Sequence, residues 1–96
     1  MLHLIFQSPV DSAIFDRMAV GDVAVFLESG VLGVLQNSRL ADMLQKKREN
    51  IRFYVLSEDM TIRGILETEL IAGFEVIDYV GLVKLSVENS LIKSWH

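Results

Sequence analysis

Four short runs of apolar residues recur along the chain and predict four β-strands. They span residues 2–6, 23–27, 51–56 and 74–77. Three of the four contain β-branched or aromatic residues side by side with little polar alternation, which is typical of strands buried on both faces of a parallel sheet. The gaps of 16, 23 and 17 residues are much longer than hairpin loops and long enough for crossovers between parallel strands. The pattern therefore predicts an α/β fold.

The segments between these runs predict helices. Residues 11–19 place apolar side chains on one helical face, and residues 30–35 form an apolar turn or short helix. Ser38 is a candidate cap for a second helix whose last turn is basic, as the helix dipole favours. Asp59 is a candidate cap for a short helix over residues 60–66.

Residues 79–88 fit two patterns. Apolar and polar residues alternate over residues 83–88, as in a strand, but an apolar stripe at helical spacing also runs through the segment. Asp78 stands where a helix cap is expected, so we predict a helix here and a short edge strand over residues 91–95. Residues 1–96 then form a single domain.

The composition indicates a folded domain that cannot bury all of its apolar residues. Hydrophobic residues make up 51% of a chain of 96 residues, and so small a domain has a high ratio of surface to volume. A partner is the simplest cover for the surplus, so we expect an interface. The 23% of charged residues and the single Pro argue against disorder.

Charge and the N-terminal residues bear on location and partners. The net charge of −4 disfavours direct binding of nucleic acid, which a basic face normally supports. No apolar run approaches the roughly 18 residues of a membrane span, and residues 1–6 lack the basic region of a signal peptide. We therefore expect a cytoplasmic protein.

The chain contains no cysteine, which excludes disulfides, thiolate zinc sites and thiol nucleophiles within it. It therefore cannot itself carry a cysteine persulfide. His3 and His96 stand apart from any cluster at metal-ligand spacing, so we interpret them as satisfied core or surface histidines. No Ser–His–Asp set is recognisable either. We predict no catalytic residue, no metal and no cofactor.

The first candidate site follows the second predicted strand. Ser29 and Gly30 lie where that strand ends, a place at which α/β proteins often bind anions on helix N-termini. The segment has no GxGxxG pattern, and Glu28 would repel an anion. Gly30 and Gly33 could allow a ligand to approach the backbone closely, but a tight strand-to-helix turn is the simpler interpretation.

The second candidate site is residues 57–64, the densest polar stretch, which follows the third strand. Asp59 and Arg63 are spaced i, i+4 and can pair along one helix face, and Gly64 can end that helix. Together with Glu58 they form either a cap with a surface ion pair or the rim of a binding surface.

Trp95 is the third candidate. Burial of so large a ring contributes roughly 1.5–3 kcal/mol, and the preceding residues 91 and 92 are apolar. We predict that the tail docks in the fold or at an interface, with Trp95 at least half buried and its indole N–H near a partner group.

Several short motifs resemble the TusB/DsrH family of sulfur-relay proteins in their order and spacing. The resemblance covers nearly the whole chain. The matching segments are Met1-Leu2-His3 with Ser8-Pro9, Gly21-Asp22, Gly30-Val31, Tyr54-Val55-Leu56 with Glu58-Asp59 and Arg63-Gly64, Ile77-Asp78-Tyr79 with Leu82-Val83-Lys84-Leu85, and Trp95. Ser29 departs from the pattern, since the family usually has Asp there.

The resemblance implies a three-layer α/β/α sandwich around a parallel sheet of four to five strands, of the DsrEFH-like type. It also implies a heterohexamer with TusC-like and TusD-like subunits. Such a complex resembles a relay that takes persulfide sulfur from a TusA-like donor and passes it to a TusE-like acceptor for 2-thiolation of tRNA wobble uridine.

Some DsrH relatives carry a cysteine in the first helix, whereas residues 16–19 here contain none. The resemblance therefore favours a non-catalytic subunit of the tRNA-thiolating branch, with the sulfur-carrying cysteine on the TusD-like partner.

Two other classes of function are alternatives. A small-ligand-binding regulatory module would use the loops at residues 28–33 and 57–63, although no phosphate-binding loop is present. An independent enzyme is disfavoured by the missing nucleophile and metal set.

Overall fold

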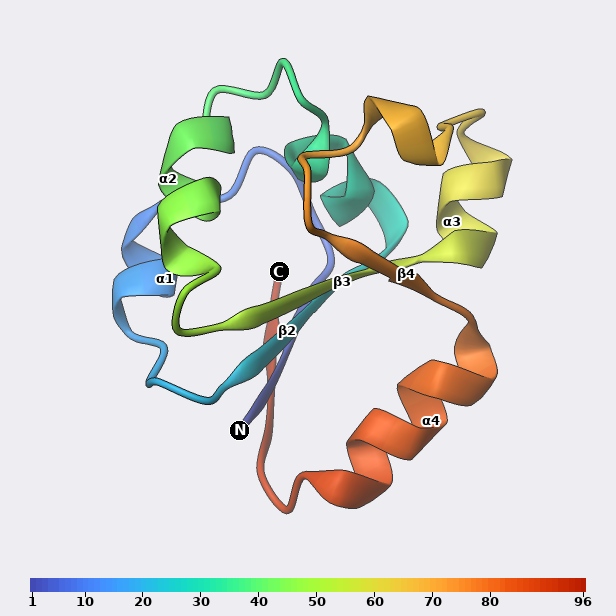
Figure 1. Cartoon of the computed structure of the whole chain (residues 1–96). Helices are drawn as coiled ribbons and strands as arrows, with labels where there is room; N and C mark the ends of the chain where they lie inside the picture. Colours follow the sequence, from blue (N-terminus) through green and yellow to red (C-terminus); the bar gives the residue numbers. More distant parts are fainter.

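A five-stranded parallel sheet forms the centre of the computed structural model, which describes all of residues 1–96 (Figure 1). The strand order is β4-β3-β2-β1-β5. The strands are β1 (Leu2–Ile5), β2 (Val23–Phe26), β3 (Arg52–Leu56), β4 (Glu75–Ile77) and β5 (Ile92–Trp95). The four predicted strands and the predicted edge strand are confirmed, and each is one residue shorter than its predicted segment.

Helical segments connect the strands and cover the sheet. They are α1 (Ala13–Asp16), the 3₁₀ helix η1 (Glu28–Val34), α2 (Ala41–Lys47), α3 (Ser57–Ile62), the 3₁₀ helix η2 (Glu67–Glu69) and α4 (Tyr79–Glu88). The helical interpretation of residues 79–88 is confirmed. Asp78 caps α4, because its Oδ1 accepts a hydrogen bond from Gly81 N at 2.9 Å.

α1 is shorter than the helix predicted over residues 11–19. At its start, Asp11 Oδ1 accepts from Ala13 N at 2.9 Å. Beyond its end, Asp22 Oδ2 accepts from Ala19 N at 2.9 Å, which removes this amide from the helical ladder. Side-chain acceptors compete with helical hydrogen bonds in this way, and hydrophobic periodicity does not reveal them.

The predicted cap of the second helix is wrong in detail. Ser38 Oγ accepts from Leu40 N at 3.2 Å, but α2 begins only at Ala41 and has no side-chain cap. Ser38 therefore orders the turn that leads into α2 and does not cap the helix itself.

The larger core cluster, of 14 buried residues, packs one face of the sheet against α1, α2 and η1. Its centre is aromatic. Four phenylalanine rings, those of Phe15, Phe26, Phe53 and Phe74, pack with centroid separations from 4.9 to 6.2 Å. Aromatic pairs at these separations stabilise a core beyond the area that they bury.

The opposite face carries a smaller cluster under a single helix, α4 (Figure 1). Its buried residues are Leu2, Val23, Val25, Tyr54 and Leu85, of which only Leu85 comes from a helix. The fold is thus the predicted three-layer α/β/α sandwich, and its third layer is one helix thick.

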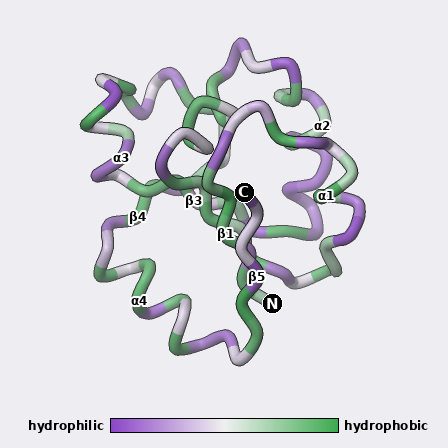
Figure 2. The backbone as a smooth tube through the Cα atoms, turned by 180° about the vertical axis from the view of Figure 1, so that it is seen from behind, coloured by the Kyte–Doolittle hydropathy of each residue, from purple (hydrophilic) through white to green (hydrophobic).

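α4 turns a second apolar face outward. Apolar stretches interrupted by polar ones run along this helix in Figure 2. Val80, Val83 and Val87 are 62%, 60% and 81% exposed, and their i, i+3, i+7 spacing places them on one side of the helix. We refer to these three residues as the valine stripe.

Asp22 is a buried carboxylate that ties the start of β2 to β1. Its Oδ2 accepts from His3 Nε2 at 2.8 Å and from Ala19 N at 2.9 Å, and its Oδ1 accepts from the Met1 amine at 3.1 Å. Burial by itself raises the pKa of Asp22, but these hydrogen bonds favour the charged form and lower the pKa to about 2. His3 is therefore a satisfied core histidine, as predicted.

The Asp22 network predicts a contribution to stability that acid removes. Because the pKa falls from 3.8 to about 2 on folding, the ionised carboxylate stabilises the fold fully above about pH 4 and loses this effect as the pH falls towards about 2. Asp22→Asn should lower the free energy of unfolding by about 2 kcal/mol at pH 7. Urea unfolding of wild type and Asp22→Asn at pH 7 and near pH 2 measures the difference in free energy of unfolding, which should nearly vanish near pH 2.

Asp16→Asn is the matched control. Asp16 pairs with Lys47 at 3.0 Å, but its side chain is 73% exposed, and such surface pairs contribute at most about 1 kcal/mol. If Asp22→Asn lowered the free energy of unfolding equally at pH 7 and pH 2, ionisation of Asp22 would not stabilise the fold.

Candidate functional site at the carboxyl edge of the sheet

Two of the predicted polar segments meet at the carboxyl ends of β2 and β3. Glu28 N donates to Asp59 Oδ2 at 2.7 Å, across 31 positions of sequence, and Asp59 is 7% exposed. Glu28 has a φ of 51°, a left-handed conformation that is uncommon outside glycine. The buried carboxylate therefore holds the first residue of η1 in an unfavourable conformation.

The prediction that Asp59 caps its own helix is wrong. α3 begins at Ser57, its N-cap residue is Leu56, and no side chain caps it. Asp59 lies in the first turn, where its carboxylate reaches the neighbouring β2–η1 turn instead. The tertiary contact with Glu28 thus replaces the local cap that the sequence suggested.

The predicted ion pair along α3 is also not formed. Arg63 is exposed and takes part in no salt bridge, because the carboxylate of Asp59 is directed to Glu28 N. Gly64 has a φ of 67° and follows the C-cap residue Arg63. Its predicted role as the end of the helix is confirmed, since only a residue without Cβ adopts this conformation readily.

Gly30 is the position at which the turn needs a glycine for space. A Cβ built on Gly30 would overlap the carbonyl oxygen of Ile5 on the neighbouring strand β1. At Gly33 the nearest atom to such a Cβ is Ser8 Oγ at 3.8 Å, an ordinary contact. The backbone of β1 thus approaches closely at Gly30 and not at Gly33. Ser29, between Glu28 and Gly30, is partly buried.

Glu58 extends this edge to the next helix. Its Oε2 accepts from Tyr79 N at 3.3 Å, and its Oε1 accepts from Ser57 Oγ at 3.0 Å. Adjacent carboxylates on α3 thus bind one amide of η1 and one of α4. Both act as acceptors for backbone amides, so they hold η1, α3 and α4 in fixed positions relative to one another.

Trp95 lies apart from this group, at the end of the edge strand β5. Its ring is partly buried against the larger core cluster, and its indole N–H donates to His3 Nδ1 at 3.1 Å. The predicted docked tail and indole partner are confirmed. Our sequence analysis did not identify His3 as that partner. The sequence could have suggested His3, because a histidine on the core face of a strand must find hydrogen-bond partners.

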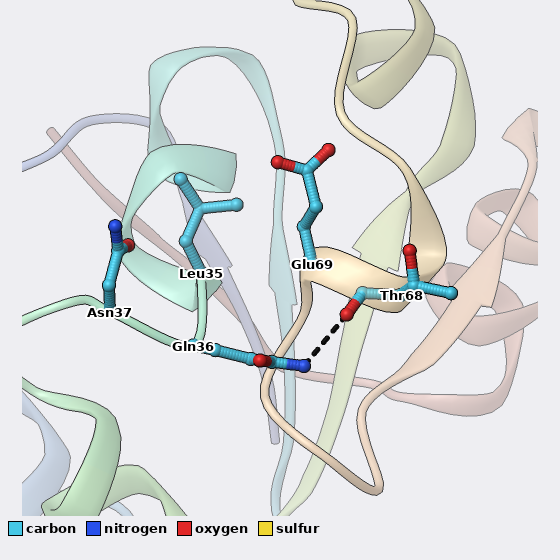
Figure 3. A pocket seen from close by; sticks show the side chains of 5 residues that line it. All are labelled: Leu35, Gln36, Asn37, Thr68 and Glu69. Carbon is cyan, nitrogen blue, oxygen red and sulfur yellow. Dashed lines mark hydrogen bonds between the residues drawn. The ribbon is translucent and has the colours of Figure 1, made fainter.

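A shallow hollow lies between the end of η1 and η2 (Figure 3). It is lined by Leu35, Gln36, Asn37, Thr68 and Glu69. Its volume is about 270 Å³, and Gln36 Nε2 donates to Thr68 O at 2.7 Å. Small-molecule sites are usually larger and mostly apolar, so this hollow does not have the character of a ligand pocket.

The loops required by the ligand-binding alternative lack a shared cavity. Leu32 and Gly33 line a hollow with residues 8–10 and 38–40, whereas residues 28–31 and 57–63 line none of the surface cavities. No group of three or more His, Cys, Asp or Glu residues is placed to hold a metal ion. No helix has the length and apolar character to cross a bilayer.

Comparison with protein families identifies the lineage. The family model described as "DsrH like protein" matches residues 6–91. The chain belongs to the DsrH family. The family resemblance inferred from the motifs is therefore confirmed. This DsrH chain is also 34% identical over 98 residues to Protein TusB of Erwinia tasmaniensis, an alignment that covers 99% of this chain and 100% of that protein.

Two solved structures share the fold of this DsrH protein. A protein of unknown function from Methanobacterium thermoautotrophicum superimposes with a TM-score of 0.80 at 16% identity, covering 98% of this chain and 96% of its own. A Thermotoga maritima protein solved by NMR superimposes with a TM-score of 0.63 at 15% identity, with 93% and 94% covered. At these identities the likeness concerns the architecture alone.

The tight contact at Gly30 predicts opposite outcomes for two glycines of the same 3₁₀ helix. Gly30→Ala should destabilise the DsrH fold by about 1–3 kcal/mol, because the added methyl group must push the η1 backbone away from β1. Gly33→Ala is the matched control and should change the free energy of unfolding by less than about 1 kcal/mol. Chemical denaturation of the three proteins measures this, and equal destabilisation would contradict a specific contact at Gly30.

Proposed function

We propose that this DsrH protein is a non-catalytic subunit of a cytoplasmic sulfur-relay complex that acts in tRNA modification. The observation that carries the proposal is the full-length likeness to Protein TusB, at 34% identity, together with membership of the DsrH family. The absence of cysteine from the chain agrees with an accessory role.

The finer proposal concerns the course of the sulfur. We propose a heterohexamer with TusC-like and TusD-like subunits that receives persulfide sulfur from a TusA-like donor. The complex would pass the sulfur to a TusE-like acceptor for 2-thiolation of the wobble uridine. A thiolate is the side chain that can hold a transferable persulfide, so the reacting cysteine must lie on another chain, and we propose that it belongs to the TusD-like partner.

The surface of the chain supports assembly with other subunits. The valine stripe exposes three β-branched side chains on the face of the fold that has only one covering helix. Exposed apolar patches on small domains commonly mark protein interfaces. We propose that this stripe lies against a TusC-like or TusD-like subunit.

The polar candidates divide between two proposed roles. Asp59, Glu58, Gly30 and Gly64 shape the carboxyl edge through backbone contacts, and Ser29 lies in the same turn. Their proposed role is structural.

Arg63 is exposed and free of salt bridges, so it is the member of this set that we propose for partner contact.

Assembly should depend on the valine stripe. A charge placed within a buried interface is strongly unfavourable. Val83→Asp should therefore abolish co-purification with co-expressed TusC-like and TusD-like subunits. Lys84→Asp is the matched control, because it adds the same carboxylate at the next, solvent-exposed position of α4. Circular dichroism checks that both variants fold, and undiminished assembly of Val83→Asp would exclude the stripe from the interface.

The accessory role predicts which chain gains sulfur. When the assembled complex is incubated with a persulfidated TusA-like donor, the intact mass of this chain should stay constant while that of the TusD-like subunit rises by one sulfur atom. Replacement of the reacting cysteine of that subunit by serine is the control and should remove the gain. A stable sulfur adduct on this chain would contradict the proposal.

A further inference from the structure

Three side chains form a line of hydrogen bonds that ends on the C-terminal strand. Trp95 Nε1 donates to His3 Nδ1 at 3.1 Å, and His3 Nε2 lies 2.8 Å from Asp22 Oδ2. An indole N–H can only donate. His3 Nδ1 must therefore present its lone pair to Trp95, and the ring proton must lie on Nε2, facing the carboxylate. The arrangement requires neutral His3 in this tautomer.

We propose that this line of hydrogen bonds is a proton-operated latch on β5, which holds the strand at Trp95 while His3 is neutral and loosens it when Nδ1 takes up a proton. A protonated imidazole carries an N–H at both ring nitrogens. The new N–H of Nδ1 would then point at the indole N–H of Trp95, so that two hydrogen-bond donors would face each other. The contact with Asp22 survives, because Nε2 still donates, so protonation opens only the Trp95 side.

The carboxylate beside His3 stays ionised in mild acid. Asp22 also accepts from the Met1 amine at 3.1 Å. Its pKa of about 2 keeps Asp22 ionised across that range. A proton taken up by this pair while Asp22 is ionised therefore goes to Nδ1, the ring nitrogen whose lone pair accepts from Trp95, and not to the carboxylate.

The elements that flank or cover His3 on this face, β5 and α1, also carry charged groups. Lys93 is opposite His3 in the β1–β5 register, and its Nζ is 5.1 Å from the centroid of the Trp95 ring. This cation opposes a second positive charge on the β5 side of the imidazole. On α1, which covers the same face, Asp16 is paired with Lys47 at 3.0 Å. The exposed Arg17 follows α1.

β5 is held to β1 by backbone pairing along its length, but Trp95 supplies its only partly buried side chain. It lies at the edge of the sheet, and its residues Ile92, Lys93 and Ser94 are exposed. Trp95 is the member of β5 that packs on the larger core cluster, and its carbonyl oxygen accepts from Phe6 N at 3.1 Å. Loss of the indole hydrogen bond therefore weakens the strand at its one partly buried residue.

The latch can be followed in the intact chain with two independent signals. Trp95 is the only tryptophan, so its emission reports docking of its ring. Exchange of the Phe6 amide, corrected for the intrinsic rate, reports opening of the carboxyl end of β5. Between about pH 8 and pH 5 we expect emission to shift to longer wavelength. The corrected exchange of Phe6 should accelerate roughly 2- to 10-fold, in step with the His3 ring ¹⁵N shifts.

Three variants separate the latch from other effects of acid. His3→Asn places a non-titrating amide oxygen near the position of Nδ1, so emission should become independent of pH. Trp95→Phe removes the donor, so Phe6 exchange should be fast at both pH values. His96→Gln removes the only other histidine, whose ring stacks on Phe6 at 4.6 Å, and should keep the wild-type response.

Several outcomes would overturn the latch. Protonation of His3 without a change in emission or in Phe6 exchange would do so, as would a His3 that stays neutral down to pH 5. A response that His96→Gln abolishes would assign the effect to the wrong histidine. Should His3→Asn fail to fold, wild type, Trp95→Phe and His96→Gln still decide the question.

Discussion

A parallel sheet must be covered on both faces, and this chain covers one of them with a single helix of ten residues. The face under α1, α2 and η1 holds a cluster of 14 buried residues, whereas the face under α4 holds five. α4 directs Leu85 into this smaller cluster and leaves the valine stripe in solvent. Part of the apolar surplus in the composition is thus exposed on the thin side of the fold. A subunit of a larger complex can leave a face in this state, because association supplies the missing layer.

The acidic residues at the ends of the strands serve the backbone. Asp22, Asp59, Glu58 and Asp78 each accept a hydrogen bond from at least one backbone amide. Amides at the ends of helices and in turns have no partner in a regular ladder, and when buried they need an acceptor. A carboxylate committed in this way is poorly suited to act as a general base. The polar carboxyl edge, where many α/β proteins carry out chemistry, is here a set of structural ties.

This division of tasks fits a chain without cysteine in a sulfur-relay family. In the complex that we propose, the reactive atom is a thiolate sulfur on another chain. The contribution that we propose for this protein is geometric, since a rigid domain can hold its partners in register and shield a persulfide from water. Rigid connections at the carboxyl edge and an apolar outer helix are the features that such a role requires.

The sequence by itself determined the elements and their class. Apolar runs, gap lengths and the Asp78 cap specified the strands, the parallel crossovers and α4, because these signals act over a few neighbouring residues. Only the tertiary structure decided which polar groups meet. Asp59 binds Glu28 N rather than capping α3, and Trp95 binds His3 across 92 positions of sequence. Such pairs depend on strand order and register, which bring distant side chains together, and no local pattern encodes that distance.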